Sequence, residues 1–406
     1  MVLALLLVPL VVQAEAQQGK VVDPNGAAIA GATVTAGNRT TLTDAAGHYR
    51  IEGSEAIKVR APGYARSLPA TSGDTVRLTP LLPKALYLTV YGIGAPFLRD
   101  PALEVIQTNR LNALVVDLKG DRGLIPYPSA VPLAQKAGAT KLRTIPDLQQ
   151  LVASLKARNL YLIARIVVFK DDLLVGLRPD WAVRSGRAVW KDREGLAWID
   201  PFVKEAWDYS LAVAEEAAAA GFDEIQFDYV RFPDATGLSF SQGATEATRV
   251  QAITSFLREA RRRLAPYNVF TAVDVFGYAC WNYDDTGIGQ RIEDIADATD
   301  YISPMLYPSS FHLGIPGYRN PVQHPYEIVK LSLDVCKRRT AAAPARYRPW
   351  LQAFTDYAFG GQKFGAIEIG KQIDAARDAG TVGWMLWNPR NVYSNSDFRP
   401  EPKPAH

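Results

Sequence analysis

The sequence is poor in the residues that build metal centres and disulfide frameworks. Its 406 residues include only two cysteines and four histidines. The histidines do not occur at the spacing of zinc ligands, so a zinc site held by histidines is not expected. The cysteines, Cys280 and Cys336, can form at most one bridge with each other, and the sequence favours two unpaired residues.

The sequence also has little net charge and few long apolar runs. The formal net charge is +3, which is too small to indicate binding to nucleic acid or to an anionic membrane. An apolar run at residues 1–16 ends in the A-x-A-like sequence Ala14-Glu15-Ala16, although it lacks a positively charged start. We therefore expect a signal peptide-like segment and export to the periplasm, the cell envelope or the medium. The mature chain has no later run of about 18 apolar residues, so no integral membrane segment is expected.

Two catalytic fingerprints are missing as well. No G-x-S-x-G sequence marks a nucleophile elbow, and Cys280 has no evident histidine partner, which disfavours serine and cysteine hydrolases.

The overall composition, 48% hydrophobic and 21% charged, is typical of a folded protein. The length fits one large domain plus a small module.

Residues 17–82 predict the small module. Short β-prone stretches alternate there with turn sequences such as D-P-N-G and A-P-G-Y, which indicates an antiparallel β-sandwich. The patterns G-K-V-V-D-P-N-G-A-A-I-A-G-A-T-V, T-D-A-A-G-H-Y-R-I and V-R-A-P-G-Y resemble the carboxypeptidase regulatory-like (transthyretin-like) domain. The resemblance implies an accessory module of an exported protein, without catalytic residues.

Residues 85–395 predict a (β/α)8 TIM barrel. Strand-like and helix-like segments alternate through this region, and eight such repeats are typical of that fold. A doubly wound open sheet is the alternative, but no G-x-G-x-x-G fingerprint follows the first strand. A Pro-rich tail at residues 396–406 stands where the last helix would end. The eight expected strands are residues 86–93, 113–119, 161–169, 224–230, 269–276, 301–307, 348–354 and 383–388.

Strand alternation selects the side chains that point into such a barrel. Residues i and i+2 share a face of a strand, so an apolar set on one face leaves the polar set toward the barrel axis. Active sites of these barrels lie at the C-terminal ends of the strands. The polar side chains predicted to point inward are Asp117, Lys119, Arg165, Gln226, Asp228, Asp274, Ser303, Tyr307, Gln352 and Asn388.

Three of these residues, Asp117, Asp228 and Asp274, are carboxylates from strands two, four and five. Carboxylates that converge repel one another, so at least one pKa should rise, as an acid/base pair requires. Two alternatives stay open: a salt-bridge network that only fixes the barrel, and a site for Mg²⁺ or Ca²⁺. We favour the acid/base interpretation and expect no metal or other cofactor.

Four motifs resemble a TIM-barrel family classed as glycoside hydrolases. They are N-A-L-V-V-D-L-K-G-D-R-G, F-D-E-I-Q-F-D-Y-V-R-F-P, D-V-F-G-Y and D-Y-I-S-P-M-L-Y-P-S. The resemblance implies carbohydrate hydrolysis. By position, Asp228 matches the strand-four nucleophile of α-amylase-like and α-galactosidase-like barrels. Asp274 matches the strand-five acid/base of the α-amylase-like group, which has Glu where this chain has Asp.

Glycoside hydrolysis needs one carboxyl group that donates a proton and one that attacks or activates water. We assign the first role to Asp274 and the second to Asp228, with Asp117 as the alternative second carboxylate. Retention or inversion depends on the carboxylate separation, which the sequence leaves open. The side chains expected to bind sugar hydroxyls, steady the carboxylates or stack on sugar rings are Arg165, Gln226, Arg231, Tyr307, Gln352, Trp281, Trp350 and Trp387.

The expected function is therefore hydrolysis of a polysaccharide or an envelope glycan, with carbohydrate as the partner. The alternative is a catalytically inactive glycan-binding or envelope scaffold protein, in which the β-sandwich serves as an adhesion module. Aromatic faces beside unperturbed carboxylates would fit that alternative.

Overall fold

The computed structural model describes residues 16–340 and 346–399. The chain divides into two compact units, Met1–Pro80 and Leu81–His406. The signal peptide-like segment predicted at residues 1–16 lies outside the described residues except for Ala16, and so does the tail predicted at 396–406 from residue 400 onward. Within the described residues, no helix combines the length and the apolar composition needed to cross a membrane.

The first unit consists of two three-stranded sheets around a small apolar core. The sheet orders are β4-β1-β6 and β3-β2-β5, and β6 runs parallel to β1 whereas the other pairs are antiparallel. Inward side chains such as Val21, Val34 and Val59 form the core. The strands are β1 (Ala16–Val22), β2 (Thr33–Ala36), β3 (Arg39–Leu42), β4 (His48–Glu52), β5 (Lys58–Arg60) and β6 (Thr75–Arg77).

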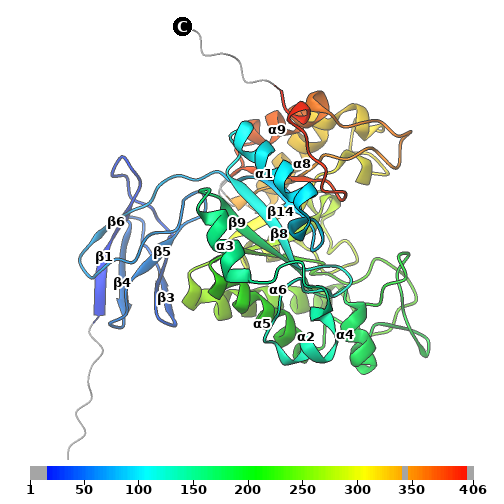
Figure 1. Cartoon of the computed structure of the whole chain (residues 1–406), viewed down its shortest axis with the longest axis horizontal. Coiled ribbons are helices and arrows are strands. Elements are labelled where there is room, and N and C mark those ends of the chain that lie inside the picture. Colours follow the sequence, from blue (N-terminus) through cyan, green and yellow to red (C-terminus); the bar gives the residue numbers. More distant parts are fainter. Residues whose placement is uncertain (1–15, 341–345, 400–406) are drawn as a thin grey trace, which may run out of the picture. The chain divides into compact units, whose positions relative to one another are not determined.

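The second unit is a closed barrel of eight parallel strands, which confirms the predicted fold class. Figure 1 shows the strands β8 and β9 among the helices of this unit. Each strand pairs with its neighbour in chain order, and β16 closes the barrel against β7. A short hairpin of β10 (Arg184–Ser185) and β11 (Ala188–Val189) extends from the loop after β9. The barrel strands are β7 (Lys84–Leu88), β8 (Ala113–Lys119), β9 (Tyr161–Val167), β12 (Glu224–Asp228), β13 (Phe270–Phe276), β14 (Tyr301–Met305), β15 (Trp350–Gln352) and β16 (Trp384–Trp387).

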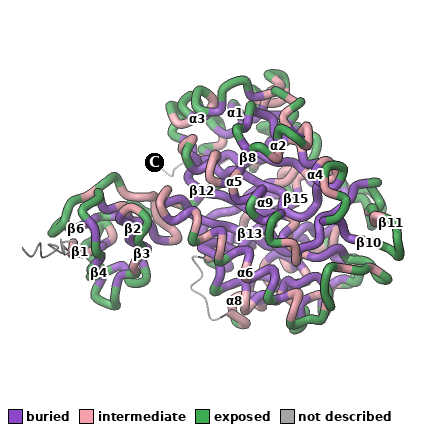
Figure 2. Tube along the Cα trace, turned by 90° about the horizontal axis from the view of Figure 1, so that it is seen from below, coloured by how far each residue is buried: buried purple, intermediate pink, exposed green. Residues whose placement is uncertain are grey.

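Helices surround the barrel and create two apolar layers. Figure 2 shows the strands buried beneath more exposed helices. Alternate residues such as Leu114 and Phe227 pack outward against helices, whereas Val115 and Ala272 pack inward. The helices are α1 (Pro96–Thr108), α2 (Pro132–Lys136), α3 (Leu148–Lys156), α4 (Asp172–Leu177), α5 (Lys204–Ala220), α6 (Glu246–Leu264), α7 (Ile292–Ala296), α8 (Pro325–Thr340) and α9 (Ala366–Asp378).

The transition from α5 to β12 places the strand that carries Asp228. The Ala-rich sequence favours a helix, and the helix ends at Gly221, whose φ of 106° is accessible to glycine without a Cβ penalty. Ile225 and Phe227 then pack outward against the helices, so Gln226 and Asp228 point toward the barrel axis.

A bulge near the end of β8 changes the direction of Lys119. The register between β8 and β9 shifts between Asp117 and Lys119, and an extra residue in a strand reverses the alternation beyond it. Lys119 Nζ pairs with Asp171 (2.8 Å) and lies 5.3 Å from the ring of Tyr209 on α5. The prediction that Lys119 points into the barrel is therefore wrong.

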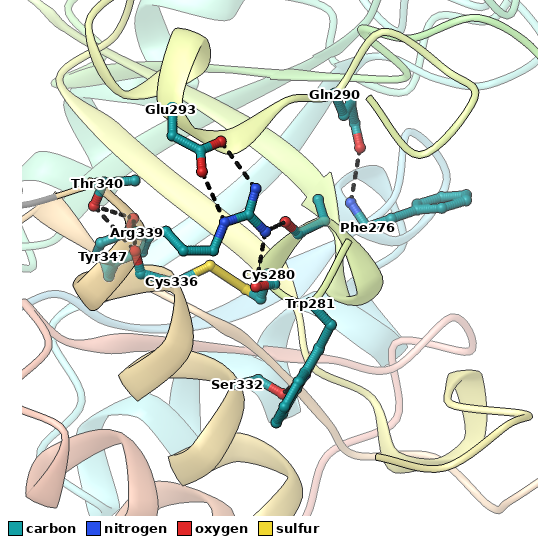
Figure 3. The surroundings of a disulfide bond; sticks show 11 residues. Phe276, Cys280, Trp281, Gln290, Glu293, Ser332, Cys336, Arg339, Thr340 and Tyr347 are labelled. Carbon is teal, nitrogen blue, oxygen red and sulfur yellow. Dashed lines mark hydrogen bonds and ion pairs between the residues drawn. A yellow bond between two sulfur atoms is a disulfide. The ribbon is translucent and has the colours of Figure 1, made fainter. Parts of the chain in front are cut away.

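Cys280 and Cys336 form a disulfide, so the preference for two unpaired cysteines is also wrong (Figure 3). Cys280 lies in a 3-10 turn, η5 (Gly277–Cys280), directly after β13, and Cys336 lies on α8. Arg339 donates hydrogen bonds to the carbonyl oxygens of Ala279 and Cys280 and pairs with Glu293 of α7. The disulfide and these contacts attach the end of the strand that carries Asp274 to two helices.

Candidate active site

The three predicted carboxylates meet around one arginine at the C-terminal ends of the strands. Arg165 Nη1 donates to Asp117 Oδ1 at 2.6 Å, and its Nε and Nη2 donate to Asp228 Oδ2 at 3.0 and 2.5 Å. Its Nε also lies 3.8 Å from Asp274 Oδ2. The strand register explains the meeting, because Asp117 of β8 lies directly opposite Arg165 of β9.

Asp274 is the most enclosed of the three carboxylates, with a side chain that is 1% exposed. Its Oδ1 accepts a hydrogen bond from Trp350 Nε1 at 2.8 Å, and its Oδ2 has no hydrogen-bond partner among the described residues. Burial, and then the charge of Asp228, raise the pKa of Asp274 well above its ordinary value, although Arg165 and Trp350 oppose the shift. Asp274 therefore holds a proton at a pH at which an ordinary carboxyl group is ionised.

Both oxygens of Asp117 and of Asp228 accept hydrogen bonds, unlike those of Asp274. Tyr87 donates its hydroxyl hydrogen to Asp117 Oδ2 at 2.6 Å, and burial raises the pKa of Asp117 to about 6 against the effect of Arg165. Asp228 Oδ1 accepts the backbone N–H of Tyr229 at 2.6 Å. The Asp228 side chain is 9% exposed, more than the other two carboxylates. The cluster thus contains three carboxylates around a single cation, and burial raises the pKa of two of them, Asp117 and Asp274.

Aromatic rings surround Arg165. The rings of Tyr87 and Trp387 stack with centroids 4.0 Å apart, and the Arg165 guanidinium lies 5.0 Å from the Trp387 ring. The predicted residue Trp387 is therefore part of the cluster. Tyr87 was not predicted, although its alternation with Ala85 on β7 would have indicated an inward side chain. Trp350, predicted as a stacking face, is fully buried and binds Asp274 instead.

Three aromatic rings, those of Tyr307, Phe354 and Tyr357, lead from the carboxylates to the surface. We call these three residues the aromatic series. Tyr307 lies close enough to Asp274 and Asp228 that burial and their charges raise its pKa well above the ordinary value. Its ring is 5.5 Å from that of Phe354, which lies 6.1 Å from Tyr357. Tyr357 is 63% exposed and lies 6.3 Å from the ring of His312. The predicted Tyr307 is thus the buried end of a path that reaches solvent.

The two predicted glutamines are fully buried and serve the protein itself. Gln226 Nε2 donates to Ser303 Oγ (3.1 Å) and lies near Met385 Sδ in the packed barrel interior. Gln352 Nε2 donates to Ser309 Oγ (2.7 Å), and its Oε1 accepts the Ser309 N–H. These contacts favour a positioning role for both residues rather than direct contact with a sugar.

Of the remaining two predicted residues, Trp281 lies away from the carboxylate cluster and Arg231 lies near it. Trp281 packs against α8, where its Nε1 donates to Ser332 Oγ at 2.9 Å beside the disulfide (Figure 3). The structure therefore does not bring Trp281 to the carboxylate cluster. Arg231 does lie near it, three residues beyond Asp228, with its guanidinium 4.5 Å from the ring of Phe276 at the end of β13. Among the described residues, no group of three or more His, Cys, Asp or Glu side chains is arranged to hold a metal ion.

Two family models match the chain. The model described as "Putative glycosyl hydrolase domain" matches residues 85–393. The model described as "Carboxypeptidase regulatory-like domain" matches residues 18–82. Both agree with the resemblances drawn from the sequence. No curated protein matches the chain.

Solved structures of similar proteins include three bacterial examples. A hypothetical protein from Ruminiclostridium thermocellum is 37% identical, with 47% of this chain and 97% of that chain covered, at a TM-score of 0.41. The glycoside hydrolase domain of PgaB (BpsB) from Bordetella bronchiseptica is 15% identical, with 77% and 95% covered, at a TM-score of 0.56. The catalytic domain of β-amylase from Paenibacillus polymyxa is 12% identical, with 79% and 96% covered, at a TM-score of 0.49. The likeness to PgaB shows a shared fold.

Proposed function

The chain belongs, over residues 85–393, to the family described as "Putative glycosyl hydrolase domain", and we propose that its barrel hydrolyses glycosidic bonds in a polysaccharide or an envelope glycan. The observation that carries the proposal is the pair Asp228 and Asp274. They come from adjacent strands and share Arg165 Nε at 3.0 and 3.8 Å. Their environments differ, because Asp228 accepts two guanidinium N–H bonds whereas Asp274 is enclosed and its pKa is raised. A carboxyl group with a raised pKa suits the general acid, and a carboxylate held by a guanidinium suits the nucleophile.

In the proposed reaction, Asp274 donates its proton to the glycosidic oxygen while a carboxylate oxygen of Asp228 attacks the anomeric carbon. The bond between that carbon and the leaving oxygen breaks, and a glycosyl ester on Asp228 forms. Water then attacks the anomeric carbon and gives a proton to the Asp274 carboxylate. The ester bond breaks, and both residues return to their starting states. Asp117 comes from β8, which is not a neighbour of β13, and its carboxylate binds Arg165 and Tyr87, which supports a role in positioning Arg165.

The distances support retention of configuration at the anomeric carbon. The two Oδ2 atoms can lie no farther apart than the sum of their distances to Arg165 Nε. That limit excludes all but the shortest separations of inverting enzymes, which run from about 6.5 to 9.5 Å, and it includes the whole range of retaining enzymes, about 5–5.5 Å. We therefore assign Asp228 as a nucleophile rather than as a base that activates water.

A specific observation favours a second candidate function, glycan binding without cleavage. The Asp274 side chain is 1% exposed and its free Oδ2 is enclosed. A proton donor in that position reaches a sugar only after neighbouring side chains move. The aromatic series, which ends in the exposed Tyr357, supports the binding of a sugar chain under either function.

Sugar release separates the two functions. The parent protein and its Asp228→Asn and Asp274→Asn variants are incubated with a panel of polysaccharides that includes bacterial envelope and capsule polymers. The parent should release reducing sugar, and each variant should lose about 10²-fold or more in rate. Asp208→Asn, an exposed change on α5, should retain the parent rate.

Equal release by the parent and Asp228→Asn would remove Asp228 from the mechanism. Glycan affinity in all four proteins without any release would support the binding function. For a cleaved substrate, proton NMR of the first product should show the anomeric configuration of the substrate, and inverted product would overturn the nucleophile assignment.

A further inference from the structure

Arg231 is a partly exposed arginine that has no carboxylate partner. It lies three residues beyond Asp228, and in the described part of the chain no ion pair involves it. Arg165 and Arg348, in contrast, are each joined to buried carboxylates. A cation removed from water without an anion is costly, and such groups persist in proteins when they are paired or used.

Aromatic rings enclose the Arg231 guanidinium but leave hydrogen-bond donors free. Its central carbon lies 4.7 Å from the ring centre of Trp198, 5.2 Å from that of Tyr229 and 4.5 Å from that of Phe276. Ring faces stabilise the charge, yet they do not replace hydrogen-bond acceptors for the planar group. Only Nη1 has a protein acceptor among the described residues, the Phe232 carbonyl oxygen at 3.0 Å.

The remaining donors of Arg231 are open to a ligand. None of its nitrogens is among the fully buried polar atoms that lack a partner, so the unpaired N–H groups of this partly buried side chain keep some contact with solvent. A guanidinium has five N–H donors in a fixed fork that matches the two oxygens of a carboxylate. The arrangement therefore offers a planar cation with its fork exposed, held between rings at the end of β12.

Three acidic groups act on Arg231 through their charges, and two of them are committed to other partners. Asp228 is bound by Arg165, and Asp192 is bound by Lys170 and by the indole N–H of Trp198. Asp234 is exposed to solvent. Burial lowers the pKa of Arg231, although Tyr229 and these three acids oppose the shift. Among the described residues, no ion pair thus joins Arg231 to any of these three acids, and Asp234 is the one that is not held by another group.

The backbone conformation of Tyr229 helps to place its ring beside the Arg231 guanidinium. Tyr229 has a φ of 52°, a conformation that non-glycine residues rarely adopt. It occurs between Asp228 and Arg231, where the chain leaves the strand. Strained backbone of this kind is concentrated at functional sites, and here it sets the Tyr229 ring beside the guanidinium.

We propose that Arg231 binds a carboxylate carried by the sugar chain next to the cleaved bond, so that the substrate is an acidic polysaccharide of the uronic acid type. The inference rests on the proposed function, because it places the carboxylate in the same site as Asp228. Trp198, Tyr229 and Phe276 would pack around the bound residue, and the free fork of Arg231 would select it over a neutral sugar.

Paired oligosaccharides test this inference. The probes are oligomers of galacturonate, alginate and hyaluronan, each beside its carboxyl-reduced neutral counterpart. Calorimetry with the parent protein should show at least one acidic oligomer binding about tenfold or more tightly than its neutral counterpart. Arg231→Gln should remove that preference, and Arg231→Lys, which keeps the charge without the fork, should reduce it. Arg193→Gln removes an exposed positive charge from the loop after β9 and should preserve the preference.

Each other outcome contradicts the inference. These are equal binding of acidic and neutral oligomers, no binding of any acidic oligomer, or an unchanged preference in folded Arg231→Gln and Arg231→Lys proteins. The two proposals can fail separately. Carboxylate-dependent binding through Arg231 without cleavage would retain this inference and reject hydrolysis. Equal cleavage of acidic glycans and their neutral counterparts by the parent, unchanged in Arg231→Gln, would retain hydrolysis and reject this inference.

Discussion

Asp228 and Asp274 are the same residue type on adjacent strands, yet their hydrogen bonds differ. Asp228 accepts from a guanidinium and a backbone amide, whereas Asp274 accepts from the Trp350 indole. Hydrogen bonds and nearby cations favour the charged form of a carboxyl group, and burial disfavours it. The side chains that touch each carboxyl group, rather than its residue type, therefore assign the two roles.

Removal of the hydrogen bond from the Trp350 indole to Asp274 should shift the pH above which kcat/KM falls. The Trp350 bond lowers the pKa of Asp274 relative to an unbonded carboxyl group, so Trp350→Phe should raise that pKa further. The alkaline limb of kcat/KM against pH should then shift to higher pH, because the general acid keeps its proton longer. Trp384→Phe, a buried tryptophan at the start of β16, serves as the control and should leave the limb in place. An unchanged or lowered limb in Trp350→Phe would contradict the assignment of Asp274.

Asp117 should make the stability of the protein depend on pH. Its pKa is raised from 3.8 to about 6 in the folded protein, so the folded state binds more protons than the unfolded state between these values. The stabilising contribution is complete below pH 3.8 and is lost as the pH rises through about 6. Between pH 4 and pH 7, the parent should lose about 2 kcal/mol of unfolding free energy relative to Asp117→Asn. Urea titrations at several pH values measure this difference, and a parent that gains stability relative to the variant would contradict the expected sign.

At the scale of elements, β13 and η5 carry the acid and attach it to the helices. The disulfide joins η5 to α8, and Arg339 joins η5 to α7. These contacts restrain the segment directly after Asp274. The disulfide joins residues 56 positions apart in sequence, so it restrains the unfolded chain as well.

The Cys280→Ser/Cys336→Ser variant should be less stable than the parent. The two cysteines are 56 residues apart, and a disulfide that closes a loop of this order typically contributes about 2–4 kcal/mol. Chemical denaturation should show this loss in the double variant and an equal loss in the reduced parent. Reducing agent should not affect the double variant. Equal stability of the oxidised parent and the double variant would show that the bridge adds nothing.

At the scale of the whole molecule, the two units have separate apolar cores. The core of the β-sandwich contains residues only from its own strands and turns, and the barrel layers contain none of them. The carboxylate cluster and the aromatic series lie entirely within the second unit. The barrel therefore has the features of a unit that folds independently.

The barrel without the β-sandwich should fold and act on soluble oligosaccharides. Residues 81–406, produced alone, should unfold cooperatively at the midpoint of the barrel transition of the full chain. Their rate of sugar release from a substrate of the full chain should be unchanged. Calorimetry and a reducing-sugar assay check the two statements. Loss of the barrel transition or of activity would show that the sandwich contributes to the site.

Eight strands, their order in the barrel and the carboxylates that meet around Arg165 could be predicted from the sequence alone. A side-chain period of two separates inward from outward residues, and parallel strands bring their C-terminal ends together. That argument correctly placed Asp117, Arg165, Asp228 and Asp274 in one cluster. It also explains the closed barrel found over residues 84–387.

The tertiary structure decided what periodicity cannot express. A bulge of one residue turned Lys119 to the helix side, and a contact across 56 residues paired the cysteines. Packing placed Trp281 beside α8 and gave Trp350 a hydrogen bond to Asp274. Periodicity is a property of neighbouring residues along one strand, whereas hydrogen bonds, proton affinities and open donors depend on which distant side chains fill the surrounding space. For this reason the sequence could name the carboxylates, but only the folded barrel could distinguish them and leave Arg231 without an anion.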